Sequence, residues 1–403
     1  MKFAHIADCH IGAWRDPRLK DLSMKAFRKA IDIAIKQEVD FILIAGDLFN
    51  TSMPGIDYLK DTTRKLKKVQ EVGIPVYIIP GSHDQSPSGK TMLDVLEEAG
   101  LIINVVKGEV VDQKLRLKFT IDKKTGAKIT GLLGKRGMLD RKYYEQLDLE
   151  FLENEPGTKI FMFHTSITEL KPKEMEKMDS SPISFLPKGF EYYAGGHVHI
   201  VKKQEFEGYK NVVYPGPTMP ANFSELEKLG RGSMYIYNHG TVEMVPIEIV
   251  KTHSVKIDAK HKSPEETYDM IIQATREIDF KNTIVLLRIY GKLRIGKTTD
   301  IDFKSIFQKL DRQGAFFIMK NTSKLTSQEF EEIKINSSSV EEIENTIIKE
   351  HLGQIKTYFS EQEEEIAHKL LKELSSEKNE GEKVSDYNER IKTEIEKIIL
   401  EKN

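Results

Sequence analysis

Short apolar runs that each end in a polar cluster recur through the first half of the chain. They read KFAHIADCH, DFILIAGD, VYIIPGSHD, KIFMFH and YYAGGHVH. The runs at 41–45 and 76–79 are rich in β-branched and aromatic residues and do not alternate, which is typical of strands buried on both faces. Apolar residues at helical spacing over 20–37 and 56–72 predict helices that cover such strands. We therefore expect an α/β fold of layered sheets with helices outside.

The pattern changes after this first domain. A predicted hairpin at 232–250, turning at Asn238-His239-Gly240, closes the domain. Strand-like runs then alternate with helical segments, which predicts a small α+β domain. We expect its strands at 253–259, 283–290 and 316–320, and its helices at 264–278 and 302–310.

From residue 337 onward the chain is rich in Glu and Lys, with isoleucine and leucine at helical spacing. These amphipathic helices have no core of their own, so we expect them to dock on a partner, with solvated helices as the alternative. A polar break at 375–386 separates two of them. The predicted units are a first domain at 1–250, a second domain at 251–322, a linker at 323–338 and a helical region at 339–403.

Composition narrows the class of protein. Charged residues make up 31% and hydrophobic residues 39% of the 403 positions, as in a globular protein with a substantial core. Because the formal net charge is only -2, nucleic-acid binding would need a local basic surface. One cysteine excludes an intrachain disulfide framework and a cysteine-rich zinc site. The chain shows neither a secretory leader nor an apolar run long enough for a bilayer, so we expect a cytoplasmic protein.

The polar clusters contain the side chains that bind metals. The candidates are Asp8, His10, Asp47, His164, His197 and His199. In layered α/β structures, ligands gather at the carboxyl ends of strands, where all of these residues are expected. A mixed carboxylate and imidazole set favours Mn, Fe or Zn over Ca or Mg, and two metals could fit. A lone strand-end histidine would more simply satisfy loop amides, so the prediction rests on the whole set. Cys9 is expected to pack in the core.

The order Asp-x-His, Gly-Asp, Gly-x-His-Asp, His and Gly-His-x-His resembles the calcineurin-like metallophosphoesterases. Within that superfamily, MKFAHIADCHIG, IAGDLF, GSHD, FHTSI and GGHVH followed by YPGPT are similar to the double-strand-break repair nucleases called Mre-eleven or SbcD. The resemblance covers residues 1–250 and implies a metallophosphoesterase sandwich, a capping domain that contacts DNA and C-terminal helices.

For this sequence the resemblance implies two Mn²⁺ ions per subunit. Their ligands would be Asp8, His10 and His199 for one ion and His164 and His197 for the other, with Asp47 bridging both. His83 would assist the leaving oxygen and Asp84 would orient its imidazole. The implied activities are 3′-to-5′ exonuclease action on duplex ends and endonuclease action on single strands.

Ser82 departs from the family pattern, which has asparagine at this position as a ligand of the second metal. A serine hydroxyl reaches less far than an amide oxygen, so we expect weaker occupancy of the second site. A serine that binds the metal directly, or a serine that is an introduced change, is the alternative.

A basic segment is the candidate DNA surface. Between 107 and 142 there are eleven Lys or Arg against four Asp or Glu, a bias suited to contacting phosphates. Lys135 and Arg136 are the candidates within it, and a merely solvated hairpin is the alternative. Asn50, Thr51 and Ser52 are further candidates because they follow Asp47 directly.

The resemblance also implies protein partners. A homodimer would form through helices at 56–72 and 91–101. Leu59, Leu66, Leu93 or Leu96 would be exposed there, or else buried in the core. The C-terminal helices would bind the coiled coil of an ABC-type ATPase called Rad-fifty or SbcC, at DNA ends in the nucleoid.

Two other functions share the same metal ligands. One is a phosphodiesterase for small nucleotides, and the other is a non-catalytic scaffold that binds DNA ends. The run 291–298 also matches the phosphate-loop pattern G-x-x-x-x-G-K-[ST]. Its bulky residues and the polar segment after it favour a basic hairpin or loop instead.

Overall fold

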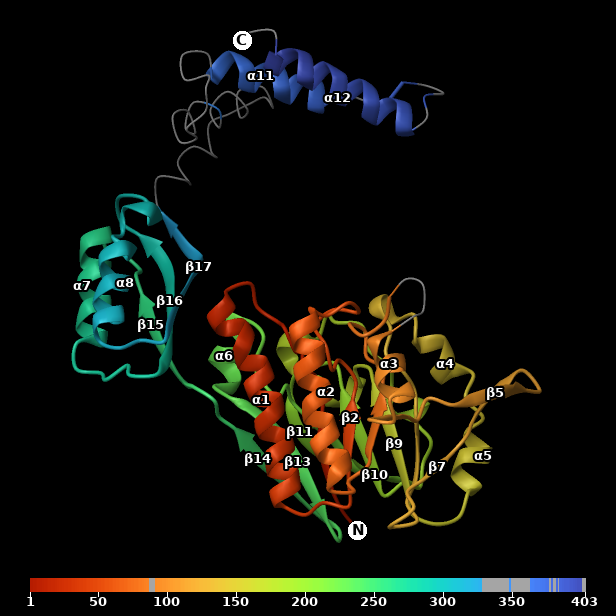
Figure 1. The fold of residues 1–403 in the computed structure, drawn as a ribbon. Coiled ribbons are helices and arrows are strands. Elements are labelled where there is room, and N and C mark those ends of the chain that lie inside the picture. Colours follow the sequence, from red (N-terminus) through yellow and green to blue (C-terminus); the bar gives the residue numbers. More distant parts are fainter. Residues whose placement is uncertain are drawn as a thin grey trace. The chain divides into compact units, whose positions relative to one another are not determined.

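The computed structural model describes residues 1–86, 91–327, 363–376 and 384–400, together with 348, 378–379 and 382. The chain, which Figure 1 colours from the N-terminus to the C-terminus, divides into two compact units. The first holds Met1–Lys256, Ala274–Arg288 and Lys304–Asn321, and the second holds Ile257–Gln273, Ile289–Phe303 and Thr322–Asn403. The boundaries at 250, 322 and 338 stay predictions.

The first sheet has six strands in the order β14-β13-β1-β2-β3-β4. Strands β1 to β4 are parallel, and β13 and β14 add an antiparallel hairpin beside β1. Their bounds are β1 Lys2–Ile6, β2 Phe41–Ala45, β3 Val76–Ile79, β4 Ile103–Asn104, β13 Gly232–Asn238 and β14 Thr241–Ile247. The predicted hairpin is confirmed, and its two turn residues, His239 and Gly240, both have the positive φ that a type I′ turn requires.

The second sheet also has six strands, in the order β11-β12-β10-β9-β8-β7. Its centre, β8, β9, β10 and β12, is parallel, and β7 and β11 are antiparallel edge strands. The bounds are β7 Thr120–Ile121, β8 Lys128–Gly131, β9 Lys159–His164, β10 Tyr192–Gly196, β11 Val201–Phe206 and β12 Tyr209–Pro215. A separate hairpin consists of β5 Gly108–Val111 and β6 Lys114–Leu117.

Helices cover the outer faces of both sheets, while the inner faces pack on each other. Phe3, Leu43 and Tyr77 of the first sheet share a buried cluster with Ile129 and Tyr192 of the second. The helices of this domain are α1 Pro17–Lys36, α2 Ile56–Glu71, α3 Met92–Glu98, α4 Arg141–Glu145, α5 Leu149–Asn154 and α6 Phe223–Leu229. The predicted layered α/β sandwich with helices outside is confirmed.

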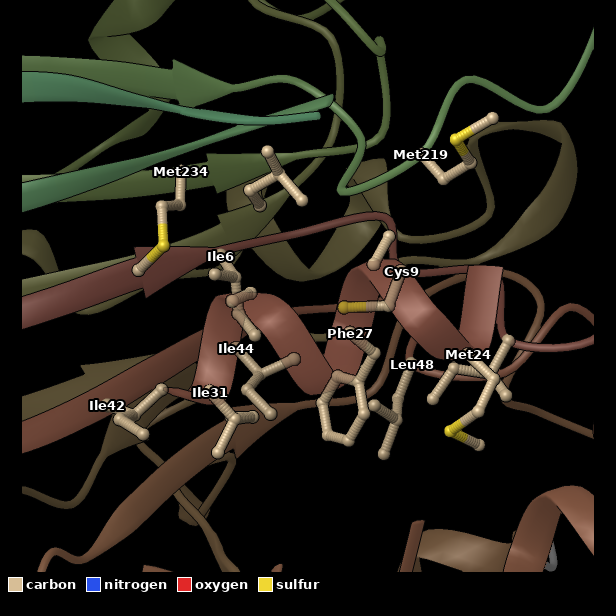
Figure 2. Close-up of a cluster of buried hydrophobic side chains, with 14 of the residues drawn as sticks. Ile6, Cys9, Met24, Phe27, Ile31, Ile42, Ile44, Leu48, Met219 and Met234 are labelled. Atoms are coloured by element: carbon tan, nitrogen blue, oxygen red, sulfur yellow. The ribbon is translucent and has the colours of Figure 1, made fainter. Parts of the chain in front are cut away.

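The outer face of the first sheet shows why these segments form these elements. Phe27 and Ile31 lie on one face of α1 and contact Ile42 and Ile44 of β2 within one buried cluster (Figure 2). Cys9 lies in the same cluster, fully buried, which confirms the prediction that it packs in the core.

The predicted α+β region follows in the expected chain order. It comprises β15 Lys251–Asp258, α7 Pro264–Thr275, β16 Thr283–Leu293, α8 Phe303–Arg312 and β17 Phe317–Ser327, with the three strands in one sheet. Strand β16 continues through Gly291, and only a single 3-10 turn at Thr298–Asp300 follows it. A phosphate loop needs a helix at that point, so the structure favours a basic loop after the strand.

Two C-terminal helices, α11 Glu363–Leu374 and α12 Val384–Leu400, flank the predicted break. Ile366 and Ile391 are buried in this pair, and the Tyr387 hydroxyl donates to the carbonyl of Ser376. The stripe predicted at Ile343, Ile347 and Ile348 lies outside the described residues, except for Ile348, which is helical and buried. Within the described part of the chain, no helix could cross a membrane.

Candidate metal centre

The candidate ligands leave the carboxyl ends of five neighbouring strands. Asp8 follows β1, Asp47 follows β2, and the 81–84 loop follows β3, which is the order of these strands in the first sheet. His164 ends β9 of the second sheet, and the segment with His197 and His199 follows its parallel neighbour β10. Because the two sheets lie face to face, these ends meet at one edge of the sandwich.

The backbone at these residues adopts a conformation that side chains other than glycine rarely take. Five candidate ligands have positive φ: Asp8 at 50°, His10 at 41°, Asp47 at 51°, His197 at 97° and His199 at 52°. Such residues cost about 1–3 kcal/mol each and persist where the surrounding structure holds them, which is typical of functional sites. The amides of Asp8 and His10 donate to the carbonyls of Gly46 and Asp47, so the loops hold each other.

One group of donors converges on a single point. The Nε2 atoms of His10 and His199 lie 2.9 Å apart, and Oδ1 of Asp8 lies 3.7 Å from Nε2 of His199. One ligand atom from each of these three residues falls within 4.8 Å of the others. Two imidazole nitrogens that face each other at this distance need a proton or a cation between them. This arrangement suits a metal ion.

Asp47 connects that group to the second set. Its Oδ2 lies 3.2 Å from Nε2 of His164 and 3.7 Å from Nε2 of His10, and Asp8, Asp47 and His164 form another convergent group. The ring of His197 stands 5.1 Å from that of His164, and its amide donates to both carboxylate oxygens of Asp8. All six candidate ligands are thus brought together.

The buried Nε2 of His164 supports a metal in the second set. Nδ1 of His164 donates to the carbonyl of Ala45 at 2.8 Å, which directs Nε2 into the site. There the buried Nε2 faces Oδ2 of Asp47 at 3.2 Å as an ion pair. A cation that replaced the proton between this nitrogen and the carboxylate would bind both. The donor set therefore fits a divalent cation.

Gly46 allows His164 to approach this closely. A β-carbon at position 46 would lie 2.2 Å from Nδ1 of His164, and the φ of +85° also favours glycine. In the Gly-Asp sequence after β2, the glycine is thus required for close packing, and the aspartate is the candidate ligand.

His83 lies beside the centre, but Asp84 does not orient it. One ring atom of His83 falls within 4.8 Å of ligand atoms of His10 and Asp47, and its Nδ1 bonds to the carbonyl of Asn50 at 2.8 Å. The carboxylate of Asp84 accepts instead from the amides of Gly81, Leu48 and Phe49. The expected role of Asp84 is corrected: it ties two loops together, because its side chain turns toward their amides and away from the imidazole.

Two of the imidazoles are kept neutral in the metal-free site. Burial lowers the pKa of His10 to about 3, with His199 adding to the effect, and it lowers the pKa of His197 to about 4, with His164 adding to it. A neutral imidazole has the lone pair that a metal needs.

The other two imidazoles carry the charge that balances the carboxylates. Burial lowers the pKa of His164, but the carboxylate of Asp47 outweighs it and raises the pKa to about 10. Burial likewise lowers the pKa of His199, and Asp8 together with Glu225 raises it to about 9. The buried carboxylates therefore draw positive charge into the site, which a divalent cation would also supply.

A cavity of about 660 Å³ opens at the centre. Asp47, Ser82, His83, His197 and His199 line it on the metal side. Ser82 is thus placed at the site, although it is only 6% exposed.

The predicted DNA-contacting residues lie on two loops that contact the 81–84 loop of the centre. The loop that follows β8 reaches the centre, since the amide of Gly134 donates to the carbonyl of Pro80 before the 81–84 loop. Lys135 comes next and donates to the hydroxyl of Tyr143, while Arg136 and Thr51 are exposed. Asn50 and Ser52 are partly exposed. Contact of these residues with DNA stays a prediction.

Glu225 belongs to the site, although no sequence motif singles it out. This residue lies on α6, and its Oε1 accepts from Nδ1 of His199 at 2.9 Å. The signal present in the sequence was Asn222-x-x-Glu225, a pattern for the start of a helix, and the Asn222 side chain does accept from the amide of Glu225. That pattern predicts α6, but it does not indicate which residue Glu225 contacts.

The fold and the site define a calcineurin-like phosphoesterase, and residues 1–201 match the model of that family. Three archaeal relatives are each named DNA double-strand break repair protein Mre11. The Archaeoglobus fulgidus protein is 30% identical over 57% of this chain and 53% of its own length. The Sulfurisphaera tokodaii protein is 30% identical over 66% of this chain and 69% of its own length. The Sulfolobus acidocaldarius protein is 25% identical over 94% of this chain and 97% of its own length.

The chain belongs to the Mre11 family of these phosphoesterases. The match with the Archaeoglobus protein spans about half of that protein, 53%. Family membership, together with the clustered donors, indicates a hydrolase that binds divalent metal.

Proposed function

We propose that this protein is a metal-dependent DNA nuclease that acts in double-strand-break repair. The observation that carries the proposal is the convergence of Asp8, His10, Asp47, His164 and His199, with the ring of His197 beside His164, next to a loop that bears Lys135 and Arg136. The Mre11 relatives support DNA as the substrate, and one of them aligns with 94% of this chain.

Two Mn²⁺ ions fit the donors. Asp8, His10 and His199 would hold one and His164 and His197 the other, with Asp47 bridging them. Two such cations lower the pKa of a shared water and neutralise a phosphate. Nδ1 of His83 donates to the carbonyl of Asn50, so the opposite nitrogen of this ring would face the leaving oxygen, and it would donate to that oxygen when the ring carries both protons. Asp84 keeps the loops of Asp47 and His83 in register.

Product analysis separates this function from its rivals. End-labelled linear duplex, circular single-stranded DNA and a cyclic dinucleotide would each be incubated with Mn²⁺ or Mg²⁺. We expect shortening of the duplex from its 3′ ends and cutting of the circle, both favoured by Mn²⁺. Hydrolysis of the dinucleotide alone would identify a small-nucleotide phosphodiesterase, and DNA binding without cleavage would identify a scaffold.

The basic loop has a matched test on one strand. Lys135 and Arg136 lie in the loop that follows the C-terminal end of β8. Lys123 and Lys124 lie in the turn that precedes the N-terminal end of the same strand. Replacing Lys135 and Arg136 with Gln should weaken DNA binding and lower its salt slope by about 1 per lost phosphate contact. The same change at Lys123 and Lys124 should leave both unchanged.

Two partner contacts complete the proposal. Leu371, Leu374 and Ile399 are exposed on the C-terminal helices, which suits docking of an ABC-type coiled-coil ATPase. Leu374→Glu should abolish capture of that ATPase and retain cleavage, with Lys372→Glu as the control. The protein would act in the cytoplasm, at the nucleoid.

A homodimer stays part of the proposal, but three of the suggested leucines are not available for it. Leu66, Leu93 and Leu96 are buried in the core, as the alternative reading had it. Ile56 and Val95 are exposed on the same helices, and they are the residues through which a second copy would bind. Light scattering of Ile56→Asp with Val95→Asp should show a monomer.

A further inference from the structure

The four candidate histidine ligands differ in how their rings are held. His164 is enclosed, with no side-chain exposure, and its Nδ1 is fixed by a backbone carbonyl. The side chain of His10 is 4% exposed and is therefore held by packing. His199 is 19% exposed and follows a strand on a loop, at a φ of 52°, so packing alone does not fix its ring.

Glu225 supplies what packing does not. Its Oε1 accepts from Nδ1 of His199 at 2.9 Å, which places the proton on Nδ1 and directs the lone pair of Nε2 toward His10 and Asp8. Carboxylates behind a metal-binding histidine fix its tautomer and orientation and make it a stronger ligand.

The start of α6 holds the Glu225 carboxylate in turn. Its Oε2 accepts from the amide of Ala221 at 2.8 Å, and its Oε1 also accepts from the side-chain amide of Asn222. Since the amide of Glu225 donates back to Asn222, the carboxylate is anchored on both sides before it meets His199. It is thus a fixed support and not a mobile surface group.

We propose that Glu225 is a positioning residue for His199, and that it makes the group of Asp8, His10 and His199 the tighter of the two cation sites. This inference rests on the proposed metal centre. It assigns the order in which the sites fill: a cation enters beside His199 first, and the set of His164 and His197 fills at higher concentration.

The test is Mn²⁺ binding, followed by electron paramagnetic resonance and calorimetry on the full chain. In the unaltered protein we expect two classes of site. Glu225→Gln keeps an oxygen that can accept from His199 but removes the charge, and Glu225→Ala removes both. Loss of such a partner typically weakens metal binding by about 10- to 100-fold. We expect this loss of affinity only in the tighter class of site, and we expect it to be larger in Glu225→Ala than in Glu225→Gln.

Glu191→Gln is the matched control. Glu191 is a half-buried carboxylate just before β10, at the other end of the strand that leads to His197, and it accepts from the hydroxyl of Tyr237. Glu191→Gln should leave the Mn²⁺ affinity of both classes of site within twofold of that in the unaltered protein. The melting temperature of each metal-free variant reports folding. The single amide oxygen of Glu225→Gln can keep the contacts that Oε1 makes with His199 and Asn222 but not the contact of Oε2 with the amide of Ala221, and this variant keeps the test valid if the alanine variant unfolds. Glu225→Asp should recover part of the lost affinity.

The outcomes separate this inference from the proposed function. If Glu225→Gln binds both cations as tightly as the unaltered protein, or weakens both classes equally, the inference is wrong while the metal centre stands. If the unaltered protein binds no Mn²⁺, the proposed function itself fails.

Discussion

The two halves of the metal centre use the same kinds of donor but support them differently. Around His199 the support is a carboxylate on a helix at the cavity, whereas around His164 it is the backbone carbonyl of Ala45 in the buried sheet. The first half has Asp8 besides Asp47, which lies between the two halves, and the second half has Ser82 where the family pattern has asparagine. A charged side chain therefore supports the ring of His199 on the open half, and close packing supports the ring of His164 on the enclosed half.

This difference teaches which changes should affect each half. A half whose ring is held by a carboxylate should respond to loss of that carboxylate. A half that depends on close packing should respond to the addition of a single methyl group. The following changes test these expectations.

Removal of Asp47 should have the largest effect, because its Oδ2 lies 3.7 Å from Nε2 of His10 in one half and 3.2 Å from Nε2 of His164 in the other. Asp47→Ala should abolish binding of both cations and reduce cleavage by more than about 100-fold, beyond the loss typical of an outer partner. Calorimetry with Mn²⁺ measures cation binding, and a DNA cleavage assay measures the loss of activity. Asp122→Asn is the control, since Asp122 is equally buried but accepts from Tyr77 far from the ligands. Retention of one full-affinity site in Asp47→Ala would show that the halves do not share this residue.

Gly46→Ala should disrupt the enclosed half. Its methyl group would lie 2.2 Å from Nδ1 of His164, so the ring must move and lose its bond to Ala45. We expect loss of the weaker cation site and destabilisation by about 1–3 kcal/mol from backbone strain and the contact together, measured by urea unfolding.

Gly73→Ala separates these two causes. Gly73 has a similar φ of +73°, but a β-carbon there would meet nothing within 4 Å. It should show the backbone cost alone, about 1 kcal/mol, with both cation sites intact. If the two variants behave alike, the approach to His164 is not what requires glycine at 46.

The pH dependence of metal binding should reflect the charge held in the metal-free site. Burial lowers the pKa of His164 and His199, but the neighbouring carboxylates raise them to about 10 and 9, so both rings are protonated at pH 7. A cation must displace these protons, and the apparent affinity should therefore rise as pH rises, by about tenfold per unit for each proton released. Calorimetry in buffers of different ionisation enthalpy counts the protons. A flat affinity between pH 6 and 8 would contradict the expectation.

The sequence predicted the strand ends well and the contacts between side chains poorly. Apolar runs are a local signal, so Asp8, Asp47 and His164 could be placed at strand ends from their neighbours alone. Glu225 meets His199 only because α6 folds back over the cavity, and that path depends on packing that no short motif encodes. The same reason explains Asp84, whose expected partner was its neighbour in sequence and whose partners in space include the amides of Leu48 and Phe49.

The smallest effect should come from Ser82. Its replacement tests whether the residue at position 82 is what lowers the cation affinity of the enclosed half. Ser82→Asn would extend an amide oxygen from the loop after β3 toward the cavity that Ser82 already lines. We expect tighter binding of the second cation, by up to about tenfold, and no change at the first, measured by Mn²⁺ titration. Ser82→Ala should bind the second cation as the unaltered protein does if a water now fills the gap, and more weakly if the serine hydroxyl is itself a ligand. Equal affinity in the serine and asparagine forms would mean that the weakness of this half, if it is observed, comes from the missing carboxylate support and not from position 82.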